Sequence, residues 1–271
     1  MHAARSTAIH TRERHARVSA WLEIFGLLLV AQSYHLYHNL IGHLASLRGV
    51  DYGPLLVTPL DAWIGYIPEL VWAYQLAYLA PAAMLLMLLA RLGPDVVIFR
   101  RIFVSLVTLL SIHFVLYLLL PTSGAWVRLP DAALGEGLSA ELVRVQYRLA
   151  TTWCACPSLH VSGCWLLYRV VAPHYPRARL VWLGWLLLMW AGTASIKIHY
   201  AVDGILGLTI AELVYRNVLL RLVAADACRR ELWRPAQRAL VHVTATAVLL
   251  TTLAVLTQLT RLEGPLYRLL P

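Results

Sequence analysis

Long apolar stretches occupy most of this 271-residue chain. A helix that crosses the hydrocarbon core of a bilayer, roughly 30 Å thick, needs about 20 consecutive apolar residues. Seven stretches come near this length, although the fourth is short and polar residues lie at the ends of the fourth to sixth. We therefore expect an all-α, polytopic transmembrane bundle of six or seven spans. The stretches lie approximately at residues 19–41, 64–90, 100–120, 157–172, 179–196, 200–219 and 239–258.

The composition excludes the soluble classes of protein. Hydrophobic residues make up 60% of the chain and charged residues 14%, and the mean hydropathy is +0.66. Soluble domains carry about a quarter charged residues, so this chain cannot form one water-facing globule. Four cysteines are too few for a disulfide scaffold. We expect a cytoplasmic N-terminal tail at 1–18 and a single transmembrane domain at 19–271.

The net charge is +9, and the distribution of the basic residues along the chain indicates the orientation of the spans. Lys and Arg residues collect on the cytoplasmic side of membrane proteins. If the seven spans alternate in direction, 16 of the 23 Lys and Arg residues share the side of the N-terminus and 7 lie on the opposite side. This places the N-terminus in the cytoplasm. The basic charge then indicates anionic lipid at the inner leaflet, and no nucleic-acid partner is expected.

The longest loop, at about 121–156, falls on the outer side. Within it, Ser139 can cap a helix in which Leu142, Val145 and Leu149 recur at helical spacing. An amphipathic helix lying at the outer membrane interface is expected here. The alternative is a plain solvated connector.

Two clusters of polar residues stand out at the outer ends of spans, one at 154–160 and one at 195–203. Ionisable residues are costly in hydrocarbon and indicate function when they occur at membrane depth. In the second cluster His199 and Asp203 are four residues apart, which on a helix places both side chains on one face. A carboxylate there can hold one imidazole nitrogen as N–H and leave the other as a lone pair, as a nucleophilic or basic histidine requires.

The first cluster contains the start of a helix. Pro157 suits the first turn, Ser158 lies beside it, and the free N–H groups of a helix start suit a phosphate oxygen. His160 could protonate a leaving oxygen, although by itself it could equally be a core histidine. Lys197 and Arg128 add cations on the same side, where each alone could simply face headgroups. Together these groups predict a phosphoryl-transfer site.

The two clusters resemble signatures of the type 2 phosphatidic acid phosphatase superfamily of integral membrane enzymes. Pro157-Ser158-Leu159-His160 is similar to the Pro-Ser-Gly-His signature, and His199 with Asp203 ends the third signature. The Ser-Leu-His form and the His-Tyr-x-x-Asp that follows are most similar to the inositol phosphorylceramide synthase branch, the inositolphosphotransferases. The resemblance covers about residues 60–215. Further residues that resemble this branch are Ile67-Pro68-Glu69, Tyr74, Tyr78 and Pro121-Thr122.

The resemblance implies a role for each matching residue. His199 would take the phosphoryl group as phosphohistidine, Asp203 would orient it, and His160 would protonate the leaving group and then activate the acceptor. Ser158 would bind phosphate oxygens. This chemistry implies no metal and no cofactor.

Two signature positions depart from the pattern of the superfamily. The first signature, a Lys followed after six residues by Arg-Pro, is absent, and Arg128-Leu129-Pro130 is its nearest remnant. Thr193 stands where an Arg is expected six residues before His199. We therefore expect Arg128 and Lys197 to supply the cations that bind phosphate.

The expected function is that of a lipid phosphatase or phosphotransferase with its active site on the extracytoplasmic face of the plasma membrane. The donor would be a lipid phosphate or a phospholipid, and the acceptor water or a hydroxyl. One alternative is a transporter or lipid-binding membrane protein whose polar residues line a pathway. A membrane serine protease using Ser158 or Ser162 is another, although the chain lacks a Gly-x-Ser-x-Gly setting.

Overall fold

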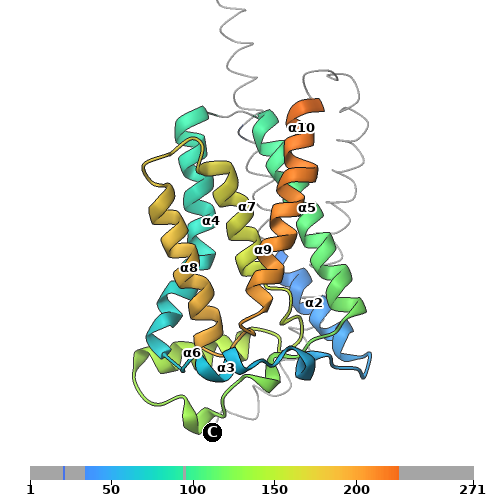
Figure 1. Ribbon diagram of the computed structural model, residues 1–271, viewed down its shortest axis with the longest axis vertical. Coiled ribbons are helices and arrows are strands. Elements are labelled where there is room, and N and C mark those ends of the chain that lie inside the picture. Colours follow the sequence, from blue (N-terminus) through green and yellow to red (C-terminus); the bar gives the residue numbers. More distant parts are fainter. Residues whose placement is uncertain (1–20, 22–33, 94–95, 226–271) are drawn as a thin grey trace, which may run out of the picture.

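The computed structural model of the protein describes residue 21 and residues 34–93 and 96–225 (Figure 1). The regular secondary structure of these residues is helical, and the described part of the chain contains no strand beyond an isolated bridge between Ser123 and Trp153. The all-α prediction is confirmed. The expected tail at 1–18, most of the first span and the seventh span at 239–258 lie outside the described residues. The longer helices are α2 (Tyr34–Ser46), α4 (Val71–Leu92), α5 (Val96–Leu119), α6 (Leu138–Leu149), α7 (Leu159–Val171), α8 (Arg179–Ser195) and α9 (Asp203–Val214).

Two helices of the described chain are long and apolar enough to cross a membrane, Pro68–Leu92 and Val97–Leu119. They match the spans expected at 64–90 and 100–120. The helices at the other three expected positions are shorter, with 13 residues in α7, 17 in α8 and 12 in α9. The last of these continues through a π-helical segment, Tyr215–Leu219, into α10 (Leu220–Ala225). The number of spans and their orientation stay predictions.

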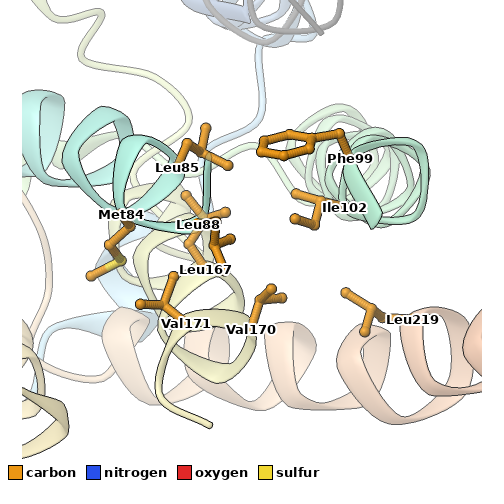
Figure 2. Packing of buried hydrophobic residues seen from close by; sticks show 9 residues of the cluster. All are labelled: Met84, Leu85, Leu88, Phe99, Ile102, Leu167, Val170, Val171 and Leu219. Carbon is orange, nitrogen blue, oxygen red and sulfur yellow. The ribbon is translucent and has the colours of Figure 1, made fainter. Parts of the chain in front are cut away.

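Helix α7 lies at the centre of the bundle, packed against α4, α5, α8 and α9. Figure 2 shows the apolar cluster at the end of α7 away from its N-terminus, where α4, α5 and α7 meet. All its members are at most 9% exposed, so this end of the bundle is closely packed. The cluster consists of Met84, Leu85, Leu88, Phe99, Ile102, Leu167, Val170, Val171 and Leu219.

An ionic cluster connects α7 with α9 at this same end. Arg169 of α7 donates to both carboxylate oxygens of Glu212 at 2.5 and 2.6 Å, and Trp165 Nε1 donates to the same carboxylate. Glu212 also pairs with Arg216 one turn later on the same helical stretch, with Arg216 Nε 2.7 Å from Glu212 Oε1. These contacts fix the relative rotation of the two helices.

A glycine lets α9 approach the start of α7. A Cβ built on Gly207 would lie 2.4 Å from the carbonyl oxygen of Ser158 and 2.8 Å from Ser162 Oγ. Real Cβ atoms do not come this close to backbone, so only glycine fits at this position. The N-terminus of α7 and the first turns of α9 are thereby held together.

Short helical turns surround the end of the bundle where α7 and α9 begin. The turn α3 and the amphipathic helix α6 lie together at this end, the lower one in Figure 1. The expected helix in the long loop is present as α6, but Ser139 does not cap it: Gly137, with φ 96°, precedes the first turn, and Ser139 Oγ instead accepts from Trp72. The short elements are η1 (Gly53–Leu56), α3 (Pro59–Trp63), η2 (Pro68–Leu70), η3 (Gly124–Trp126) and η4 (Asp131–Ala133).

Candidate active site

His199 and Asp203 form a buried pair in the segment that joins α8 to α9. His199 Nδ1 lies 2.7 Å from Asp203 Oδ2, with the histidine 6% exposed and the aspartate 0%. The spacing of four predicted this contact on a helix, but α9 begins only at Asp203. A turn makes the contact instead, closed by the Asp203 N–H donating to the Tyr200 carbonyl.

The partners of His199 fix its tautomer. Nδ1 lies 2.8 Å from the carbonyl oxygen of Ala155 as well as 2.7 Å from the carboxylate of Asp203. Both oxygens only accept hydrogen bonds, so Nδ1 carries the hydrogen and neutral His199 presents Nε2 as a lone pair. Burial lowers the pKa of His199, but the charge and hydrogen bond of Asp203 and the Ala155 carbonyl outweigh it and leave that pKa above its usual value.

The start of α7 brings His160 against His199. Their ring centroids are 5.5 Å apart at an interplanar angle of 73°. Ser158 is the N-cap of α7, where its side chain accepts from the Val161 N–H at 3.4 Å, and it is fully buried. Sequence reasoning placed the helix start at Pro157, and the structure moves it to Leu159. The N-terminus of α7, His160 and His199 therefore converge.

Arg128 lies near enough to the site for its charge to act on His199. Its guanidinium donates to the carbonyls of Tyr147, Ala150 and Thr151 at 3.0 to 3.3 Å and stacks 4.9 Å from the centroid of the Tyr147 ring. Its charge acts on His199 and lowers the pKa of that histidine. Nε of Arg128 is buried and has no hydrogen-bond partner in the described part of the chain.

Lys197 occupies a different place from the one expected. Its ammonium donates to the carbonyl oxygens of Asp61 and Ile64, each at 2.5 Å, and the residue is 8% exposed with φ 58°. Burial holds the pKa of Lys197 below its usual value, and the nearby charge of Asp61 offsets only part of this effect. The side chain therefore fastens the segment that carries His199 to the α3 region, and a role of Lys197 in binding phosphate stays a prediction.

Asp61 is a site residue that the sequence interpretation missed. It closes a capping box with Thr58 at the start of α3, and its Oδ1 accepts from the Ala201 N–H at 2.7 Å. It is 7% exposed. The pattern Thr58-Pro-Leu-Asp61 is a capping-box signature that could have drawn attention to it. Asp61 and Lys197 together hold the segment between α8 and α9.

Asp51 is a second missed residue, and it fixes the loops next to the site. One carboxylate oxygen accepts from the N–H groups of Gly53 and Ser123 at 2.7 and 2.8 Å, and the other accepts from Trp126 Nε1 at 2.8 Å. The hydroxyl of Tyr200, next to His199, donates to the Ser123 carbonyl. The loops around Asp51 and Ser123 thus support the segment that carries His199, in addition to Asp61.

The serine expected of a protease is unsuited to attack a substrate. Ser162 Oγ lies 2.8 Å from His113 Nε2, but also 2.6 Å from the Ser158 carbonyl and 3.0 Å from the Gly207 carbonyl. Both Ser162 and His113 are 0% exposed. This pair ties α5, α7 and α9 together in the interior, where no substrate reaches it.

In the described part of the chain, neither a reactive cysteine nor a cluster of metal-binding side chains adds a group to the site. Cys154 and Cys156 are free and buried on either side of Ala155, and burial raises the pKa of both thiols. In residues 34–93 and 96–225, His, Cys, Asp and Glu side chains do not gather in groups of three that could hold a metal ion.

Comparison with protein families identifies the class of protein. The model of the PAP2 superfamily matches residues 48–217. The chain therefore belongs to the PAP2 superfamily, and this membership supports a phosphatase-like enzyme. The match covers both histidine clusters and the helices α4 to α9 that carry them. No curated protein and no solved structure matched the chain.

Proposed function

We propose that the protein is an integral-membrane lipid phosphatase or phosphotransferase that works through a phosphohistidine at His199. The observation that carries the proposal is the meeting of two histidines with different partners. His199 is held by Asp203 at 2.7 Å, and the ring of His160 lies 5.5 Å away, centroid to centroid. Double displacement at phosphorus needs a nucleophile, which a carboxylate can orient, and a second group that transfers a proton. His199 with Asp203 and the neighbouring His160 can provide these groups.

The first half of the reaction uses both histidines. Nε2 of His199 attacks phosphorus, the bond from phosphorus to the leaving oxygen breaks, and the electron pair goes to that oxygen. His160 gives it a proton. Asp203 stabilises the positive charge that develops on the His199 ring, while Arg128 and the N-terminus of α7 at Ser158 stabilise the phosphoryl oxygens.

The second half reverses the proton transfer. Water or a hydroxyl gives its proton to His160 while its oxygen attacks phosphorus, and the bond from phosphorus to nitrogen breaks with the electron pair returning to Nε2 of His199. The same residues serve hydrolysis and transfer. The acceptor alone decides between them.

The substrate class and the location rest on the sequence. Long apolar stretches support a membrane-embedded enzyme with a lipid donor, and α4 and α5 are long and apolar enough to span. The Ser-Leu-His form of the second signature supports transfer of an inositol-phosphate type of headgroup. The distribution of Lys and Arg supports an active site on the extracytoplasmic face of the plasma membrane.

The test is a substrate screen on purified protein with matched histidine variants. Phosphatidic acid and phosphatidylinositol are offered as donors, with and without a lipid or polyol alcohol, and products are identified by mass. Wild type is expected to release phosphate or exchange a headgroup, whereas His199→Ala abolishes both activities. His174→Ala, in the turn after α7 at the other end of the bundle, is the control and retains them. Full activity of His199→Ala contradicts the proposal.

A further inference from the structure

Two tyrosines of α4 bracket one nitrogen of His160. Tyr74 and Tyr78 are four residues apart, and their hydroxyl oxygens lie 3.1 Å from each other. Each oxygen lies 3.3 Å from His160 Nε2. The rings also contact, with Tyr74 and Tyr78 centroids 5.0 and 5.5 Å from that of His160. Three polar atoms therefore form a triangle beside the histidine pair.

The chemical nature of these partners differs from that of the partners of His199. The carboxylate of Asp203 and the carbonyl of Ala155 can only accept, so they hold His199 in a single tautomer at Nδ1. A tyrosine hydroxyl both donates and accepts. It can accept from Nε2–H when His160 is protonated and donate to the Nε2 lone pair when His160 is neutral.

The two ring nitrogens of His160 lie in different surroundings, and this difference indicates which of them exchanges the proton. Nδ1 of His160 is fully buried, whereas Nε2 faces the two tyrosine hydroxyls, so we assign the proton exchange to Nε2. Contacts of 3.3 Å to the two hydroxyls are long for O–H···N bonds and leave them free to shorten or yield when substrate binds. His160 must be an acid in the first half-reaction and a base in the second, so both protonation states need a partner.

We propose that Tyr74 and Tyr78 are positioning residues that hold His160 at Nε2 in both of its protonation states and so enable proton transfer to and from alcohol oxygens. This inference rests on the proposed function. The leaving oxygen takes the proton from Nε2, a tyrosine hydroxyl then donates to the vacated lone pair, and the acceptor restores the proton. Phenylalanine keeps the ring packing and removes this support.

The experiment compares two leaving groups in each variant. Phosphatidic acid releases an alkoxide, which needs a proton, whereas p-nitrophenyl phosphate releases a stable phenolate, which does not. For Tyr74→Phe/Tyr78→Phe, kcat/KM on phosphatidic acid is expected to fall by about 10²-fold, within the range for lost general acid catalysis, while kcat/KM on the aryl ester changes far less. This parameter reports only the steps up to release of the leaving group, so the later step in which His160 acts as a base does not enter it. The ratio of the two rates is independent of how much of a variant is folded.

Three comparisons complete the design. His160→Ala is expected to show the same leaving-group dependence as the double variant, whereas His199→Ala loses both activities. Tyr175→Phe removes a comparable hydrogen bond, from the hydroxyl to the Met87 carbonyl, away from the site, and should match wild type. Equal losses of the double variant on both esters, or no loss on phosphatidic acid, overturn the inference and leave the proposed function standing. Wild type inactive on both esters and in the donor screen overturns the proposed function and this inference with it.

Discussion

The pair of His199 and Asp203 is the smallest unit on which the chemistry depends. The carboxylate holds Nδ1 as a donor and stabilises positive charge on the ring. Asp203→Asn preserves the shape of the side chain but lets the histidine adopt the wrong tautomer. We expect kcat to fall by up to about 10⁴-fold, the loss seen when a Ser-His-Asp site loses its carboxylate in this way. Steady-state kinetics check this, and retention of more than half of the wild-type rate contradicts it.

The same pair sets the pH dependence of the reaction. The nucleophile must be unprotonated at Nε2, and the pKa of His199 is raised above 6.5 by Asp203 and the Ala155 carbonyl against the effect of burial. Activity should therefore increase as the pH rises through this elevated pKa. Removing the charge in Asp203→Asn lowers that pKa, so the acid limb of the residual kcat profile moves to lower pH. An acid limb that stays in place, or moves to higher pH, contradicts the assignment of His199.

The substitution Lys197→Met tests whether this side chain has a structural role. In Lys197→Met the carbonyls of Asp61 and Ile64 lose their donor, which is expected to cost about 1 to 3 kcal/mol of stability. Thermal unfolding in detergent checks the loss, with exposed Arg148→Met as the control. KM for the lipid phosphate should stay near wild type. A large rise in KM with unchanged stability would support the phosphate role predicted from sequence.

The approach of α9 to α7 determines the geometry of the site at the scale of elements. In Gly207→Ala the new methyl group collides with the Ser158 carbonyl, 2.4 Å away, and separates the two helix starts. Overpacking of this kind typically costs about 1 to 3 kcal/mol, and activity should fall with it. The control is Gly163→Ala on α7, where a Cβ meets nothing within 4 Å and alanine favours the helix. Equal melting temperatures for the two variants contradict this packing argument.

The helices show how much of the fold the local sequence pattern can predict. Period and length were enough to predict α4, α5, α7, α8 and the helix α6 that precedes the first polar cluster. The start of α9 was not predictable in this way, because a turn closed between Tyr200 and Asp203 places the helix start after His199. Asp51 and Asp61 bind backbone N–H groups of segments 72 and 140 residues away. Such contacts depend on the tertiary fold and leave almost no trace in local sequence.

The site shows the same division between local and long-range information. The motifs located His160, His199 and Asp203, because their spacing within each cluster is local. They could not show that the ammonium of Lys197 is taken by two carbonyls, nor that the Nε2 atom of His160 lies between two tyrosine hydroxyls. Both facts arise from the packing of α3 and α4 against the later helices.

The placement of the charges predicts how the whole molecule is oriented in the membrane. An outer loop before α7 and an inner loop before α8 are expected from the 16 to 7 distribution of Lys and Arg. In intact cells a membrane-impermeant maleimide should label Glu136→Cys but not Arg177→Cys, both exposed positions. Cys154, Cys156 and Cys164 are buried, and Cys228→Ser removes the remaining natural thiol. The reverse labelling pattern would invert the proposed topology.

The most direct test of the mechanism is to trap the intermediate. A reaction of purified protein with its lipid substrate is quenched in base, because phosphohistidine is stable in base and labile in acid, and the peptides are analysed by mass spectrometry. We predict a phosphoryl or phospho-headgroup adduct on His199 that disappears on acid treatment and is absent in His199→Ala. Product formation with no adduct on His199, or with a stable adduct on Ser158, would contradict the phosphohistidine mechanism.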